Sequence, residues 1–144
     1  MTRMTTALAL LLLMPAPLPA QTDGARLAIT QPALVVQCFN GSAVTPRTRS
    51  WTVTTPVVLA LTMRNEPRPG MAPAGDIDPG TATITFTPEP GHRYEVEVRA
   101  EPMRFSTRVW PRGEWTPVVR DRTTDAVVSG APVWDAPPCP PAAR

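Results

Sequence analysis

The sequence predicts an all-β fold, a small antiparallel β-sandwich of immunoglobulin-like or similar type with seven or eight short strands and one disulfide. Valine and threonine, which both favour strands, make up 30 of the residues in 21–144. Seventeen prolines interrupt the same region, so no window is long enough for a stable helix. Apolar and polar residues also alternate in several segments, which is the period of a half-buried strand.

The alternation is clearest in residues 57–64, 81–87 and 93–101. The last two of these segments flank the turn sequence Pro-Glu-Pro-Gly at 88–91. Proline fixes φ and glycine allows positive φ, so this sequence favours a tight turn. We therefore expect 81–87 and 93–101 to form an antiparallel hairpin. One of its faces would carry Thr, Arg and Glu side chains in water, where opposite charges pair.

Several further segments have the composition of short strands bounded by turn residues. Pro111 to Gly113 predicts a second hairpin turn, residues 121–125 a third, and Asn40-Gly41 a tight turn. Pro117 confines its strand to a sheet edge or a bulge, since proline lacks a backbone N–H. The expected strands are residues 26–30, 34–39, 50–55, 104–110, 114–121 and 126–129.

Two proline-rich stretches are expected to lie outside the strands. Residues 65–80 contain four prolines and three glycines and predict a long loop. Residues 131–144 contain five prolines and predict an extended, polyproline-like tail. The expected organisation is a β-sandwich domain over 21–130 followed by this tail.

The first twenty residues have the three-part pattern of a secretory signal peptide. A short segment carrying Arg3 precedes an apolar run at 7–14, and residues 15–20 contain three prolines and end in Ala20. The apolar run is shorter than the roughly 20 residues that a membrane span needs. We therefore expect cleavage before Gln21 and export to the periplasm or the outside of the cell. Arginine without any lysine is typical of GC-rich coding and indicates a bacterial source.

The two cysteines of the chain, Cys38 and Cys139, lie far apart in the sequence. An even pair in an exported protein most simply forms a disulfide. Metal and redox motifs usually place cysteines two to four residues apart, which does not fit this spacing. The pair therefore predicts one disulfide that holds the C-terminal tail against the domain.

The charge distribution argues against a nucleic-acid partner. Fourteen arginines stand against twelve acidic residues, for a net charge of +2, and no basic stripe is evident. We expect no nucleic acid, no membrane span and no bound cofactor.

The four residues Trp110, Arg112, Glu114 and Trp115 are the candidate ligand-binding site. The two tryptophans flank a Pro-Arg-Gly-Glu turn. If they face water, they form a platform for a sugar ring or a peptide proline beside one charge of each sign. If they face inward, they belong to the core of the sandwich.

Metal binding is the weaker alternative. Asp76 and Asp78 stand two apart in the long loop, which is a weak calcium signal that a plain turn also explains. A copper site could be imagined from the sole histidine, His92, with scattered methionines. His92 is expected to be an exposed turn residue, without the partners that a general base needs. The methionines in question are Met63, Met71 and Met103, of which Met63 and Met103 fit a core pattern.

The function expected from the sequence is a non-enzymatic binding or structural module. The alternatives are a carbohydrate- or peptide-binding module that uses an exposed tryptophan pair, and a metal-binding exported protein. With one histidine, two paired cysteines and no lysine, the usual nucleophile and base arrangements are nearly empty. The expected partner is another exported protein or a glycan.

Overall fold

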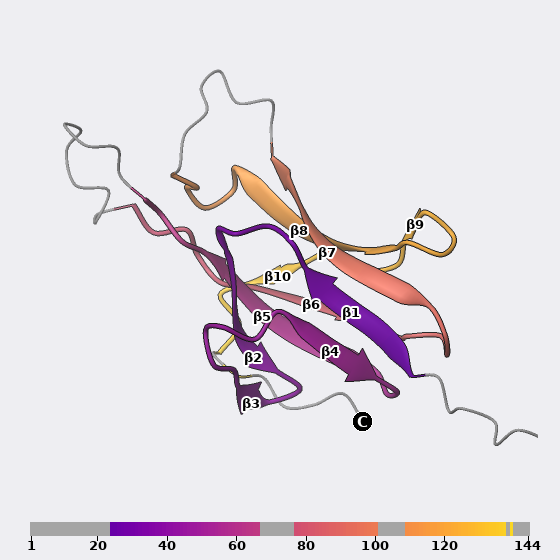
Figure 1. The fold of residues 1–144 in the computed structure, drawn as a ribbon. Helices are drawn as coiled ribbons and strands as arrows, with labels where there is room; N and C mark the ends of the chain where they lie inside the picture. The colour runs from indigo at the N-terminus through magenta and orange to yellow at the C-terminus, as the bar shows by residue number, and fades with distance from the viewer. Residues whose placement is uncertain (1–23, 67–76, 101–108, 138, 140–144) are drawn as a thin grey trace, which may run out of the picture.

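The described residues form two β-sheets that pack face to face (Figure 1). The computed structural model describes residues 24–66, 77–100, 109–137 and 139 of the 144-residue chain. Ten strands lie within these residues, five in each sheet, and three of them are only two residues long. The predicted all-β sandwich is confirmed. Among the same residues, no helix has the length and apolar character needed to cross a membrane.

The first sheet has the strand order β4-β1-β7-β8-β9. β1 pairs in parallel with β7, and the other neighbours are antiparallel. The second sheet has the order β10-β6-β5-β2-β3 and is antiparallel throughout. The bounds are β1 Ala25–Ile29, β2 Leu34–Phe39, β3 Ser42–Ala43, β4 Ser50–Val53, β5 Val57–Met63, β6 Ala82–Phe86, β7 Arg93–Ala100, β8 Trp115–Asp121, β9 Ala126–Val127 and β10 Val133–Trp134.

The expected hairpin between β6 and β7 does not form, because the turn at 88–91 carries the chain from one sheet to the other. β6 pairs with β5 and β10, whereas β7 pairs with β1 and β8. The apolar faces of β6 and β7 meet across the core instead, where the rings of Phe86 and Tyr94 lie 5.0 Å apart. Alternation predicts two strands and a turn correctly. It does not say whether the strands share a sheet or face each other.

The turns predicted at Asn40-Gly41 and at residues 121–125 are confirmed. Asn40 and Gly41 both have positive φ and join β2 to β3 in a two-residue hairpin. β8 and β9 form the hairpin expected around residues 121–125. Pro117 lies where β8 is a sheet edge, because β9 pairs only with the last two residues of β8. β8 pairs with β7 along one edge, and the expected pairing of 104–110 with 114–121 is not tested, because residues 101–108 lie outside the described residues.

The core fills the space between the sheets with aliphatic and aromatic side chains. The predicted inward set of β5 is confirmed, since Val57, Leu59, Leu61 and Met63 are all buried in it. Trp51 of β4 and Phe39 of β2 close one edge of the sandwich, with stacked rings 5.3 Å apart. Burying such residues is the dominant favourable term in folding.

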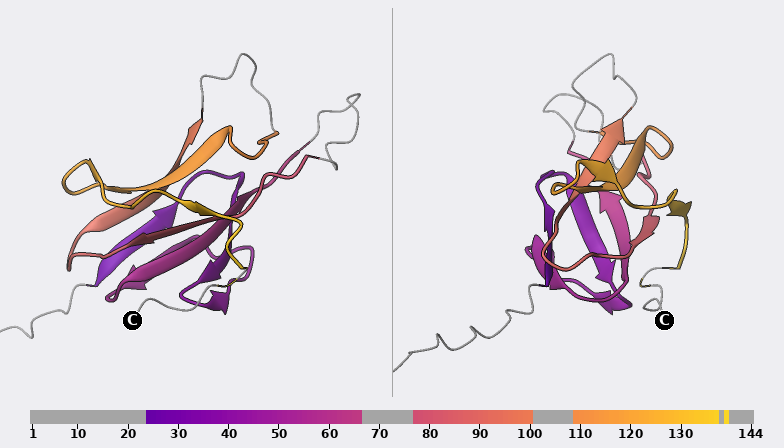
Figure 2. Two further views of the ribbon diagram at one scale, coloured as in Figure 1. Left: turned by 180° about the vertical axis from the view of Figure 1, so that it is seen from behind. Right: turned by 90° about the vertical axis from the view of Figure 1, so that its right-hand side faces the viewer.

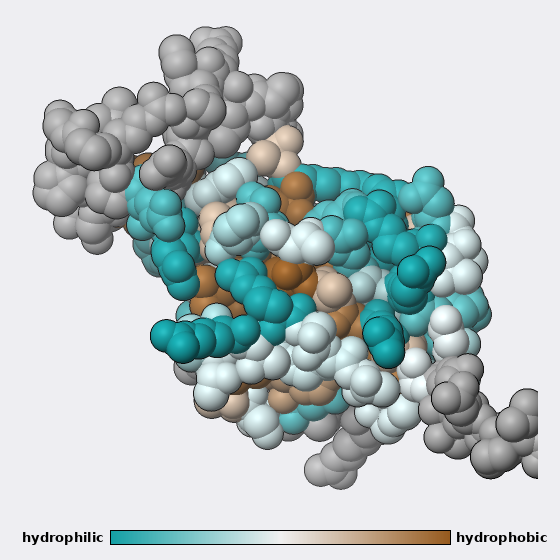
Figure 3. All heavy atoms as spheres, in the orientation of Figure 1, coloured by the Kyte–Doolittle hydropathy of each residue, from teal (hydrophilic) through white to brown (hydrophobic). Residues whose placement is uncertain are grey.

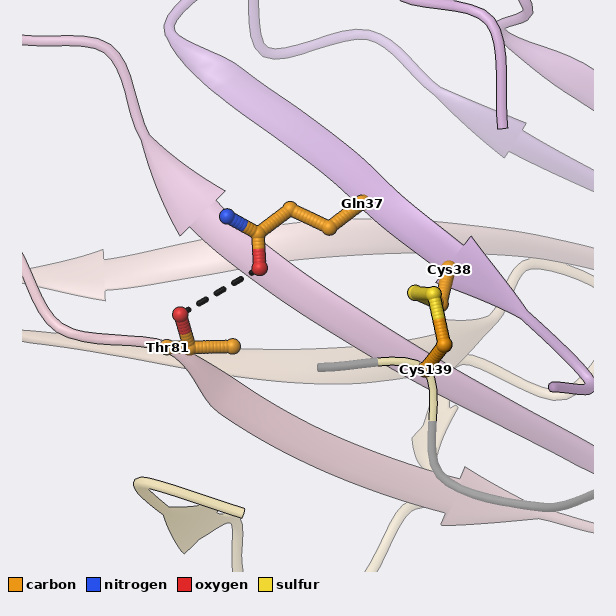
Figure 4. The surroundings of a disulfide bond; sticks show 4 residues. All are labelled: Gln37, Cys38, Thr81 and Cys139. Atoms are coloured by element: carbon orange, nitrogen blue, oxygen red, sulfur yellow. Dashed lines mark hydrogen bonds between the residues drawn. A yellow bond between two sulfur atoms is a disulfide. The ribbon is translucent and has the colours of Figure 1, made fainter. Parts of the chain in front are cut away.

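A change of register in β2 sets the direction of Cys38. Val36 pairs with the core residue Leu61, but Cys38 pairs with Ala60, so one residue is added between them. Val36 therefore faces the core, and Cys38 faces the outer side of the second sheet. Cys139 reaches it there and forms the predicted disulfide, with the two Cα atoms 4.8 Å apart (Figure 4).

The C-terminal segment covers part of this outer face. It includes β10, a strand inside the region predicted to be an extended tail, which pairs with β6. Figure 2 shows β10 at one side of this sheet, and Cys139, which follows β10 in the chain, is bonded to Cys38 of β2, so that β6 and β5 lie between the two attachments. Val58, Ala60 and Thr83 face outward by register and are nevertheless buried. The disulfide thus holds the C-terminal segment against the outer face of the second sheet.

Arg49 fastens the connection between the two sheets. Its guanidinium donates hydrogen bonds of 3.0 Å to the backbone carbonyls of Gln31, Pro32 and Leu34. One side chain therefore satisfies three carbonyls that follow β1. It also occupies the edge of β2 at Leu34, which a further strand would otherwise meet.

The outer face of the first sheet carries the charged ladder expected on β7. Arg120 of β8 pairs with Glu97, and Arg122 pairs with Glu95 and Glu97. The hydrogen bond from Thr30 lowers the pKa of Glu95, burial opposes this, and Arg122 adds to the lowering. Figure 3 shows hydrophilic side chains gathered over β7 and β8. Ion pairs at a protein surface contribute little net stability, because solvent screens them.

Candidate functional site

The structure brings the sequence-predicted site residues together at one end of the sandwich, beside the start of β8. Three connections meet there: residues 64–66 after β5, residues 77–81 before β6, and residues 109–114 before β8. The end of β10 adds Trp134 and Asp135. Trp110, Trp115 and Trp134 are called the tryptophan cluster below.

Trp115 is a core residue, so of the two orientations that the sequence left open the inward one holds for Trp115, and an exposed pair of Trp110 and Trp115 does not form. Its side chain is fully buried and packs edge-on against Trp134, with ring centroids 5.0 Å apart. The indole N–H donates a 2.9 Å hydrogen bond to the backbone carbonyl of Pro79. Trp115 is the first residue of β8 and pairs with Ala100, whose strand faces inward at every second residue. Alternation therefore turns its large ring into the core.

Trp110 and Trp134 are half-buried and pack against the core. The backbone N–H of Trp110 donates a 2.7 Å hydrogen bond to the side-chain oxygen of Asn65. The Asn65 amide in turn donates to the carbonyl of Ile77 at 2.8 Å. Asn65, which the sequence analysis placed only in a loop, thus joins all three connections at this end.

Asp78 works as a turn residue. Its carboxylate accepts a 2.8 Å hydrogen bond from the N–H of Gly80, and its carbonyl accepts one from the N–H of Arg112. Gly80 has φ +71°, and an added Cβ would lie 3.2 Å from Cγ of Arg112 and 3.3 Å from the Trp134 ring. Only glycine suits that position. Asp76, the other acidic residue considered for calcium, lies outside the described residues.

Arg112 and Asp135 form an ion pair at the rim of the tryptophan cluster, with each side chain 51 % exposed. Glu114 is exposed and lies in the turn that precedes β8. The aliphatic side chain of Ile77 is also exposed, at 40 %. This end therefore presents aromatic edges, one aliphatic side chain, one positive charge and two negative charges.

The opposite end of the sandwich holds an arrangement that the sequence analysis missed. His92 was expected to be an exposed turn residue, but its side chain is only 21 % exposed. Its Nδ1 lies 2.7 Å from Oδ2 of Asp121, and its Nε2 lies 3.5 Å from a carboxylate oxygen of Glu89. His92 lies in the turn before β7 and Asp121 is the last residue of β8, and the register of β7 with β8 brings the two together.

Asp121 is buried and fully used as an acceptor. Its other carboxylate oxygen accepts hydrogen bonds from the backbone N–H groups of Thr123 and Thr124. Burial raises the pKa of the Asp121 carboxyl, but the hydrogen bonds from His92 and the two backbone groups outweigh burial and hold the pKa below its usual value. We call Glu89, His92 and Asp121 the histidine cluster.

The remaining metal candidates do not gather. Met63 is a core residue, as its inward position predicted, and Met71 and Met103 lie outside the described residues. Both cysteines are consumed by the disulfide. Within the described part of the chain, no group of three or more His, Cys, Asp or Glu side chains is arranged to hold a metal ion.

Comparison of the chain with protein-family models, with curated proteins and with solved structures found no match. The disulfide indicates an oxidising compartment, because such bonds are rare in the reducing cytosol.

Proposed function

We propose that the protein is an exported, non-enzymatic binding module and that its partner is another exported protein. The observation that carries the proposal is the composition of the tryptophan end. Trp110 and Trp134 are half-buried at this end, where the side chains of Arg112 and Ile77 are exposed. Tryptophan and arginine are the residues most enriched among those that dominate protein–protein binding energy.

The exposed aliphatic side chain of Ile77 favours a protein over a sugar as the ligand. An apolar side chain of a protein partner would bury against it, whereas a sugar carries hydroxyl groups around the edge of its ring and gains less from an aliphatic neighbour. The supports also favour binding, because Asn65 and Gly80 fix the backbone on which the surface is built. A fixed surface loses little conformational entropy when a partner docks.

Export supports the same proposal from the sequence side. Residues 1–20 have the pattern of a signal peptide, and the Cys38–Cys139 disulfide is suited to an oxidising compartment. Mass spectrometry of protein recovered from the exported fraction tests this part separately. An oxidised chain that begins near Gln21 is expected, and a reduced chain that retains residues 1–20 would refute export.

Site-specific photo-crosslinking tests the binding surface. A photoreactive amino acid at position 112 is expected to capture one partner from the exported fraction, and the same group at position 52, exposed on β4, is not. With the partner purified, Trp110→Ala and Arg112→Glu should each weaken binding at least about tenfold. Equal capture from both positions, or unchanged affinity in both variants, would refute the proposal.

A carbohydrate ligand is the second candidate, and the half-exposed rings of Trp110 and Trp134 favour it. A glycan array on the oxidised chain distinguishes it from the first. Glycan binding that quenches tryptophan emission and is lost in Trp110→Ala would replace the protein partner as the ligand.

A further inference from the structure

We propose that Nε2 of His92 and the carboxylate of Glu89 together bind a divalent transition-metal ion of the zinc or copper type. The site lies at the end of β8 away from the tryptophan cluster and is independent of the proposed function. It supplies two protein ligands, and solvent fills the other coordination positions.

The first argument is the orientation of the histidine ring. Nδ1 lies 2.7 Å from Oδ2 of Asp121. An ionised carboxylate has no proton to donate, so it acts as the acceptor of this hydrogen bond. The ring therefore donates through Nδ1–H, and in the neutral ring the lone pair is on Nε2. Metal-binding histidines have this arrangement, in which a carboxylate holds the nitrogen that does not contact the metal.

The second argument is the spacing of the two ligand atoms. Nε2 of His92 and Oε2 of Glu89 are 3.5 Å apart, which is longer than a good N–H···O hydrogen bond. Zinc binds nitrogen and oxygen at about 2.0–2.1 Å in tetrahedral geometry, so two ligand atoms on the same ion lie about 3.4 Å apart. The observed distance leaves room for an ion between the two atoms.

The third argument is that both ligands sit on a fixed turn. The N–H of His92 donates to the carbonyl of Glu89 at 3.2 Å, and the N–H of Glu89 donates to the Tyr94 hydroxyl at 2.7 Å. The histidine ring also stacks on Tyr94, with centroids 6.2 Å apart. Glu89 is 73 % exposed, so an ion can reach the site from solvent without opening the fold.

The ligand types select the class of metal. An imidazole with a carboxylate suits zinc and copper, whereas calcium and magnesium prefer sites made of oxygen atoms alone. A two-ligand site binds more weakly than a closed structural site with four ligands. The expected role is reversible capture of an ion, and not support of the fold.

Titration of the oxidised full-length chain with zinc chloride tests the proposal. Because His92 is the only histidine, nitrogen NMR of its ring reports the site directly. Zinc should shift the Nε2 resonance while Nδ1 keeps its protonated character, and calorimetry should give one ion per chain. His92→Gln should abolish the binding, and Glu89→Gln, at an exposed position, should weaken it about tenfold or more.

The matched control is Glu114→Gln, which removes an exposed carboxylate from the turn at the other end and should leave zinc affinity unchanged. Absence of a ring shift at about 1 mM zinc would overturn the proposal. So would binding that survives both His92→Gln and Glu89→Gln, since the ion would then sit elsewhere on the chain.

Discussion

Cys38 lies opposite Ala60 on the outer face of the second sheet, although an uninterrupted β2 would turn the cysteine into the core. The extra residue after Val36 causes this reversal, and it also turns Phe39 inward against Trp51. Ala60, fully buried and small, pairs directly with the cysteine that carries the bond. The disulfide is therefore a link between the outer surface of a sheet and the C-terminal segment.

Removal of this link should lower the stability of the whole domain. The bond closes a loop with a sequence separation of 101 residues, so its loss raises the conformational entropy of the unfolded chain. We expect the double variant Cys38→Ala, Cys139→Ala to lose about 2–5 kcal/mol of unfolding free energy in urea denaturation. A reducing agent should destabilise the natural chain equally and leave the double variant unchanged. Equal stability of the oxidised natural chain and the double variant would contradict the prediction.

Trp115 and Trp110 should differ sharply in how much each contributes to the unfolding free energy. Trp115→Ala removes a fully buried ring together with its hydrogen bond to Pro79, and should cost about 3–5 kcal/mol. Trp110→Ala removes a half-buried ring and should cost about 1–2 kcal/mol. Chemical denaturation of both variants checks the order. If Trp110 proved the costlier of the two, the assignment of core and surface would be reversed.

Arg49 should stabilise the fold well beyond an ordinary surface arginine. Arg49→Ala removes the guanidinium donor from three backbone carbonyls, of which that of Gln31 keeps the N–H of Leu34, and should lower the unfolding free energy by about 1–3 kcal/mol. Arg47→Ala is the matched control, because Arg47 is exposed and two residues away, and it should change stability by less than about 0.5 kcal/mol. If thermal melts showed equal effects for the two variants, the stabilising role of the three Arg49 hydrogen bonds would be refuted.

Acid should destabilise the protein partly through Asp121. Its pKa is lower in the folded chain than in the unfolded chain, so its contribution to stability is present above the unfolded pKa of about 3.9. That contribution is lost as the pH falls through the folded pKa. Asp121→Asn should be less stable at neutral pH and show a shallower decline between about pH 5 and pH 2. Parallel curves for the two proteins would refute the assignment.

Thr83 offers a stabilising substitution. Its hydroxyl is buried on the outer face of the second sheet, and the described residues provide it with no hydrogen-bond partner. Valine has nearly the same shape and no polar group to desolvate. Thr83→Val should therefore raise the unfolding free energy by about 1 kcal/mol. Thr85→Val, at an exposed position on the same strand, is the control and should have a smaller effect.

The sequence by itself determined the fold class, most strand positions, the inward set of β5 and the pairing of the only two cysteines. The fold class and the strands follow from local composition and from a period of two residues. The disulfide follows because two cysteines can pair in only one way. The tertiary structure decided the rest. It placed β6 and β7 in different sheets, turned Cys38 outward, buried Trp115 under Trp134, and joined His92 to Asp121. These relationships depend on which segments pair and on bulges within them, and alternation along one strand fixes which face is apolar but not which strand will lie beside it.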